Sequence, residues 1–119
     1  MTNEDIDRMQ AGPELVRLIA EKVMGWHGAV EETFWPNTEW VWRDARGYKI
    51  HGPTDFSTNI AAAWRVVEKM RLSLIPTLGG DFQCDTRADT KIPYVEAHGP
   101  APLAICRAAL KVKLMEAKR

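Results

Sequence analysis

The sequence lacks the patterns by which most enzymes, metal proteins and membrane proteins are recognised. It contains no HxxxH or CxxC pair, no GxSxG motif, no Walker-type loop and no Rossmann fingerprint. No apolar run approaches the ~20 residues that a helix needs to cross a bilayer. We therefore expect no metal, no cofactor, no catalytic residues and no membrane partner.

The sequence also has no excess of positive or negative charge and only two cysteines. The 16 Lys and Arg residues balance the 16 Asp and Glu residues, so no overall positive field would attract bulk nucleic acid. The two cysteines, Cys84 and Cys106, lie far apart, as is typical of a protein kept reduced in the cytosol. Residues 1–12 are acidic and lack the apolar core of a signal peptide. These features predict a cytoplasmic protein.

What the sequence does contain predicts one mixed domain. The 119 residues fit a single domain at 13–119, after a polar lead-in at 1–12 that is loose or helical. Apolar spacing predicts helices at 13–25, 60–71 and 100–117. Strands are expected at 39–44, 48–51, 72–78, 81–87 and 91–99, and a loop at 27–38. We therefore predict an α+β fold, an α/β/α layered sandwich with a small, mainly antiparallel sheet and three main helices.

Each of these helices carries a predicted buried stripe, which in the helix at 13–25 consists of Leu15, Leu18, Ile19 and Val23. In the helix at 60–71 the stripe consists of Ile60, Ala63, Trp64, Val67 and Met70. In the last helix the inward residues are Leu103, Cys106, Leu110 and Leu114. The lysines Lys111, Lys113 and Lys118 suit the negative end of its dipole.

Three blocks of the sequence resemble a known family. VMGW near the end of the first helix, FSTNIAAAWRVVEKM at 56–70 and PAPLAICRAALK near the end of the chain look like the phage ABA-sandwich domain, roughly over residues 14–112. The resemblance implies an α/β/α arrangement and a small bacteriophage protein that acts in the host bacterial cytoplasm. It implies little about activity, because most members look like proteins of unknown function.

Two helix starts are candidate sites for an anionic ligand. The first consists of Ser57, Thr58 and Asn59, and the second is His98 with residues 99–101. Unpaired N–H groups and the partial positive charge at a helix N-terminus favour phosphate. The alternative is that Ser57 or Thr58 only caps the helix.

Aromatic residues offer a second kind of candidate site. The five tryptophans are Trp26, Trp35, Trp40, Trp42 and Trp64. Trp40 and Trp42 point to one face of the strand at 39–44, with Arg43 and Arg46 beside the following turn. A base could stack on a tryptophan while an arginine meets its phosphate. The alternative is that the tryptophans pack in the core and Arg46 is a surface charge.

The titratable residues indicate neither a metal site nor catalysis. The possible metal ligands His27, His51, His98, Cys84 and Cys106 include no pair at ligand spacing. Asp81, Asp85 and Asp89 recur every four residues, but the calcium-loop pattern is absent. We expect this segment to be a solvated turn after a short strand.

Three functions remain open at this stage. The first is a non-enzymatic, homo-oligomeric phage protein that binds a small anionic or nucleotide-like ligand. By analogy with unrelated phage proteins, it could be a counter-defence sponge for a cyclic nucleotide or cyclic ADP-ribose-type immune signal. The second is a protein–protein interaction module that inhibits a host protein or serves the virion. The third, least favoured, is a small nucleotide hydrolase.

Overall fold

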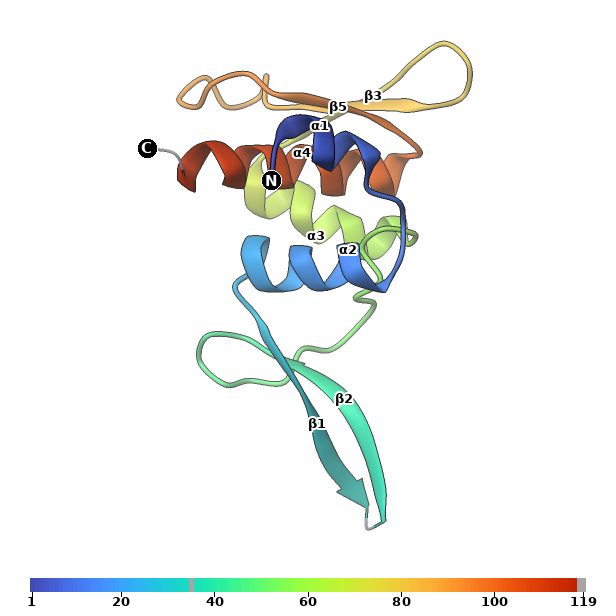
Figure 1. Ribbon diagram of the computed structural model, residues 1–119, viewed down its shortest axis with the longest axis vertical. Coiled ribbons are helices and arrows are strands. Elements are labelled where there is room, and N and C mark those ends of the chain that lie inside the picture. Colours follow the sequence, from blue (N-terminus) through green and yellow to red (C-terminus); the bar gives the residue numbers. More distant parts are fainter. Residues whose placement is uncertain (35, 118–119) are drawn as a thin grey trace.

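The helices of the molecule lie between two antiparallel sheets (Figure 1). The computed structural model describes residues 1–34 and 36–117, apart from the side chain of Thr33. Its helices are α1 (Asn3–Arg8), α2 (Pro13–Leu18), the π-helical turn η1 (Ile19–Val23), α3 (Ile60–Met70) and α4 (Ala101–Ala117). Its strands are β1 (His27–Phe34), β2 (Asn37–Arg43), β3 (Ser73–Pro76), β4 (Phe82–Asp85) and β5 (Glu96–Gly99). The predicted α+β class is confirmed, and the content is consistent with an α/β/α sandwich. The strands, however, form two sheets where one was expected.

Helix α4 is the centre of the molecule. It contacts α1, η1, α3, β4 and β5. Residues on all sides of the helix are buried, namely Leu103, Ala104, Ile105, Cys106, Ala108, Ala109, Leu110, Lys111 and Val112. A helix that is buried all round lies inside a core, whereas a surface helix has one buried stripe. The stripe predicted from the sequence is therefore only part of the surface that α4 buries.

The three-stranded sheet packs one face on α4. Its strand order is β3-β4-β5, and Leu74, Cys84 and Ala97 lie opposite one another on the face that packs into the core. Gln83 and His98 lie opposite each other on the outer face. The alternation predicted for the segment at 81–87 is thus confirmed.

The free edge of β5 is covered by two cations of α4. Lys111 Nζ donates to the carbonyl oxygen of Glu96 at 2.8 Å, and Arg107 Nη1 donates to that of His98 at 2.9 Å. Unpaired groups on an edge strand invite pairing with another chain. These two side chains therefore keep the β5 edge from pairing further.

The same two side chains attach the lead-in to the domain. Lys111 Nζ lies 2.7 Å from a carboxylate oxygen of Asp7, and Arg107 Nη2 donates to the carbonyl oxygen of Met9 at 2.7 Å. Ile6, on α1, has no exposed surface and belongs to the core. The lead-in is therefore helical over α1 and packed on α4.

The second sheet is the hairpin of β1 and β2, which extends from the body on the side away from the three-stranded sheet (Figure 1). The predicted loop at 27–38 is wrong, because β1 occupies most of it. The predicted strand at 48–51 is also wrong, because this segment makes only an isolated bridge between Lys49 and Arg43. The apolar and polar residues of β1 do not alternate cleanly, since most of the strand borders solvent on both faces.

Helix α3 buries only part of the predicted stripe, since Ala63 and Val67 are buried as expected but Ile60 and Trp64 are not. The residues of α3 with less than a tenth of their surface exposed are Ala62, Ala63, Val66 and Val67. Ile60 and Trp64, expected to point inward, are 48% and 47% exposed. Apolar residues make up more than half of this helix. Their spacing is therefore compatible with more than one face of the helix packing on the core.

Candidate functional site: a tryptophan-lined pocket

A pocket of about 480 Å³ lies where the hairpin meets the helices. Its wall comes from the start of α2, from β2 and from the segment that precedes α3. The lining residues are Gly12, Pro13, Val16, Arg17, Trp40, Trp42, Thr54, Asp55, Ser57 and Thr58. The volume is in the range that ligand sites of small molecules occupy.

The hairpin contributes two tryptophans in fixed relation to each other. The rings of Trp40 and Trp42 meet edge to face, with centroids 5.5 Å apart and planes at 82°. Trp42 is 9% exposed and anchors the pair, whereas Trp40 is 53% exposed. Gly28, opposite Trp42, makes room for both rings, because a Cβ atom there would lie 2.3 Å from Trp40 and 2.8 Å from Trp42. The pocket therefore presents the accessible ring of Trp40, which packs against the buried ring of Trp42.

Ser57 joins two walls of the pocket. Its side chain is almost fully buried, and its Oγ accepts a hydrogen bond from the backbone N–H of Gly12 at 3.0 Å. This bond ties the start of α2 to the segment before α3. Ser57 is thus a structural link in the pocket wall and does not cap α3.

The charged groups of the pocket are one cation and one anion, Arg17 and Asp55. Arg17 lies on α2, where its Nε donates to Glu21 Oε1 at 3.1 Å, and its side chain is 69% exposed. Asp55 comes from the segment before α3. The pocket can therefore offer a ligand an aromatic surface, a guanidinium and a carboxylate.

Four of the eight ligand-binding residues predicted from the sequence meet in this pocket: Trp40, Trp42, Ser57 and Thr58. The other four, Asn59, His98, Arg43 and Arg46, are not among its lining residues. The helix start at 57–59 and the tryptophan face of β2 thus contribute to a single pocket, because the base of the hairpin lies beside the segment before α3.

Asn59 is the N-cap of α3. Its Oδ1 accepts hydrogen bonds from the N–H groups of Ala61 at 2.8 Å and Ala62 at 3.1 Å. These are two of the donors that a phosphate at the helix start would use. Asn59 therefore occupies two of the backbone donors at the N-terminus of α3.

The two arginines predicted beside the tryptophans have other surroundings. Arg43 forms a two-pronged ion pair with Glu31, with Nε–Oε2 at 2.8 Å and Nη2–Oε1 at 2.6 Å. These hydrogen bonds lower the pKa of Glu31 and raise that of Arg43. Arg46 is exposed in the turn after β2, where its N–H donates to Asp44 Oδ1 at 2.9 Å.

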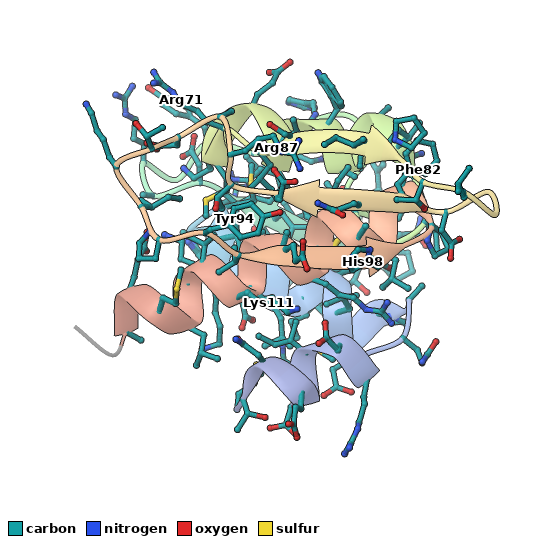
Figure 2. All side chains as sticks on the ribbon, turned by 90° about the horizontal axis from the view of Figure 1, so that it is seen from above. Arg71, Phe82, Arg87, Tyr94, His98 and Lys111 are labelled. Carbon is teal, nitrogen blue, oxygen red and sulfur yellow. The ribbon has the colours of Figure 1, made fainter. Side chains whose placement is uncertain are left out.

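His98 lies far from the pocket, on the outer face of the three-stranded sheet. Figure 2 looks onto this sheet, with His98 on β5 and with Arg87 and Tyr94 nearby. His98 Nε2 lies 3.8 Å from a carboxylate oxygen of Glu96. The second predicted helix start therefore belongs to a different surface from the first.

A polar network on that surface was missed by sequence reasoning. Its centre is Asp85, whose side chain has no exposed surface. Asp85 accepts hydrogen bonds from Gln83 Nε2 at 2.9 Å, from Arg87 Nε at 3.0 Å and from the Tyr94 hydroxyl at 3.3 Å. The expectation that Asp85 lies in a solvated turn is wrong. The only sequence signal was its position at the end of the alternating segment, facing outward with Gln83.

The network determines the charge state of Asp85. Burial by itself would raise the pKa of this carboxyl, but hydrogen bonds from Arg87 and Gln83 outweigh burial. The pKa of Asp85 therefore lies below its ordinary 3.8. Burial and the hydrogen bond with Glu96 raise the pKa of Tyr94, so a neutral phenol lies beside the ionised Asp85.

Within residues 1–34 and 36–117, no group of three His, Cys, Asp or Glu side chains is placed to hold a metal ion. No helix in the same part of the chain is long and apolar enough to cross a membrane. Trp35 and Lys118, which figured in the sequence analysis, lie outside the described residues.

Fold and site together define a small α+β protein with an aromatic pocket at the base of a projecting hairpin. A family model described as the phage ABA sandwich domain matches residues 17–110. The chain therefore belongs to the phage ABA sandwich domain family, as the three sequence blocks indicated. No curated protein and no solved structure matches the chain significantly.

Proposed function

We propose that this protein is a non-enzymatic phage accessory protein that binds a small nucleotide-like ligand in the tryptophan-lined pocket. The observation that carries the proposal is the half-exposed ring of Trp40, fixed against buried Trp42 in a pocket of about 480 Å³. Stacking on an aromatic side chain suits any nucleobase, because every base has a π-face.

The polar lining residues complement the parts of a nucleotide. With a base on Trp40, the carboxylate of Asp55 accepts a hydrogen bond from an exocyclic amino group. The guanidinium of Arg17 is the cation for a phosphate, which arginine binds in a two-pronged contact. The exposed Thr58 offers a hydroxyl to a sugar or phosphate oxygen. One guanidinium favours a ligand with few phosphates.

The pocket residues favour binding over turnover. Hydrolysis of a nucleotide by acid–base chemistry requires an acid and a base on either side of the scissile bond. Among the described residues that line the pocket, Asp55 is the one carboxylate and there is no histidine. A counter-defence sponge, which sequesters an immune signal without destroying it, fits this chemistry and a phage protein.

Isothermal titration calorimetry with a panel of cyclic dinucleotides and cyclic ADP-ribose isomers tests the proposal. Trp40→Ala should weaken binding of the ligand that the wild type takes by about 5- to 100-fold, the range that loss of one stacked base gives. Trp64→Ala is the matched control, because Trp64 is similarly exposed, at 47% against 53% for Trp40, but lies on α3 outside the lining residues. This control should leave the affinity unchanged.

Native mass spectrometry of freshly purified protein adds a test that needs no guess about the ligand. A retained small molecule that is lost in Trp40→Ala supports the proposal. Absence of any retained molecule, together with no binding across the panel, contradicts it. Chromatography that shows conversion of a bound nucleotide would instead establish a hydrolase.

A further inference from the structure

We infer that the free edge of β1 pairs with the same edge of a second copy, so that the two hairpins form one four-stranded antiparallel sheet. Ile50 N–H donates to the Trp42 carbonyl at 2.9 Å, so the backbone groups of Trp42 point away from β1. Opposite residues of an antiparallel pair share this orientation, and it alternates along each strand. Gly28, opposite Trp42, therefore points its backbone groups outward, and so do Val30 and Glu32.

This edge stands apart from the other strand edges. The β5 edge is covered by Lys111 and Arg107, and β3 ends at Pro76, which cannot donate to a ladder. The β2 edge is covered near its base by the bridge between Arg43 and Lys49. In the described part of the chain, the outward groups of β1 make no hydrogen bond. An eight-residue edge of this kind is a template for pairing with another strand.

The charges along β1 allow a second copy to pair about a two-fold axis at Val30. Across a two-fold axis at Val30, each strand places Gly28 opposite Glu32 and Ala29 opposite Glu31. No carboxylate then faces another carboxylate. An axis one residue further along would place Glu31 opposite itself, and like charges directly opposite destabilise a sheet. The interface is self-complementary, as a two-fold dimer requires.

The same register joins the exposed apolar residues of the hairpins. Val30 lies opposite Trp40 within the hairpin, and these residues are 64% and 53% exposed. Pairing at Val30 extends this pair into one continuous cross-strand row, from Trp40 through both valines to the second Trp40. Such rows are the unit of stabilisation in sheets. A lone two-stranded sheet is marginally stable in water, so two more strands also stabilise the hairpin.

Cysteine cross-linking of the full chain, without ligand, tests the register. Paired residues have Cβ atoms about 4.5–5.5 Å apart, close to the distance that a disulfide spans. Val30→Cys should form a covalent dimer under mild oxidation. Ala29→Cys is the matched control, since Ala29 is the exposed neighbour on the other face, opposite Glu31 of the other strand. The native Cys84 and Cys106 are buried and should give no background.

Light scattering after size exclusion tests the interface itself. The wild type should be a dimer or a multiple of a dimer. Val30→Pro removes an N–H that has no partner within the hairpin, so it should raise the dimer dissociation constant at least tenfold while circular dichroism stays that of a folded protein. A monomeric wild type overturns the inference. So does a dimer that Val30→Pro leaves intact, or equal cross-linking at positions 29 and 30.

A monomer whose β1 edge binds a strand of a different protein would also overturn the inference, and would favour an interaction module. Because these measurements use no ligand, their outcome is independent of the pocket. A dimer that binds no nucleotide would contradict the proposed function alone.

Discussion

Asn59 and Thr58 are neighbours in the sequence with different surroundings in the fold. Asn59 caps α3 with two hydrogen bonds, and Thr58 is an exposed residue of the pocket wall. The sequence alone predicts that Thr58→Ala and Asn59→Ala both reduce ligand binding more than thermal stability. The structure separates these two substitutions.

Asn59→Ala should lower the free energy of unfolding by about 1 kcal/mol, the usual cost of losing an N-cap. Thr58→Ala should leave stability within about 0.5 kcal/mol of the wild type, as exposed substitutions do, and weaken ligand binding instead. Urea unfolding and calorimetry measure the two effects. Asn59→Asp is the control, because it keeps the capping oxygen. Equal loss of stability in Thr58→Ala would contradict the assignment of the cap.

The lowered pKa of Asp85 implies that the stability of the protein depends on pH. Its pKa in the folded protein lies below the ordinary 3.8, so its contribution to stability is full well above pH 3.8. That contribution is lost as the pH falls through the folded-state pKa. Asp85→Asn should therefore be less stable than the wild type at pH 7, by about 1–3 kcal/mol for hydrogen bonds to a charged group.

The stability difference between Asp85→Asn and the wild type should shrink as the pH is lowered from 5 to 2. Urea midpoints at several pH values measure this difference. Asp81→Asn, in the exposed turn before β4, is the control and should match the wild type within about 0.5 kcal/mol at pH 7. A difference that stays constant down to pH 2 would contradict an ionised, hydrogen-bonded Asp85.

The residues of the pocket show how far the sequence could predict the site. Trp40 and Trp42 were predicted to share a face because side chains alternate along a strand, a purely local rule. Ser57 and Thr58 were chosen for their place before a helix. Their meeting depends on the path of the chain between residues 44 and 56, which has no periodicity. Arg17 and Asp55 carried no local signal at all.

At the scale of elements, the hairpin depends on one glycine. A Cβ atom at Gly28 would lie 2.3 Å from Trp40 and 2.8 Å from Trp42, so a side chain there must displace at least one ring. Gly28→Ala should lower the free energy of unfolding by about 1–3 kcal/mol, as overpacking does. Near-ultraviolet circular dichroism should also change, because the edge-to-face pair is disturbed. Ala29→Ser, on the other face, should preserve both signals.

Elements were predicted well where a core imposes a pattern and poorly where solvent surrounds the strand. Helix α3 and the segment of β4 follow helical and alternating spacing, and both were found. Strand β1 contains Glu31 and Glu32 side by side, so neither face is uniformly apolar. Its partner strand and the ion pair between Glu31 and Arg43 define it, and neither is a local feature.

At the scale of the whole molecule, the core determines the reactivity of both thiols. Burial raises the pKa of Cys84 and of Cys106 to about 12, far above the pH of any cell. At pH 8 a thiol reagent should label the native protein only as fast as the molecule unfolds. Labelling with and without urea measures this rate. Rapid labelling of either cysteine in the native protein would contradict a closed core around α4.

Helix α4 also has a consequence for how the protein is made. A ribosome synthesises a chain from its N-terminal to its C-terminal end, so the helix on which α1, η1, α3 and the three-stranded sheet all pack is the last described element to appear. Until residues 101–117 have left the exit tunnel, those elements have no common surface to bury. Folding during translation therefore cannot proceed element by element, and the nascent chain must acquire its tertiary structure in one late step once α4 has emerged.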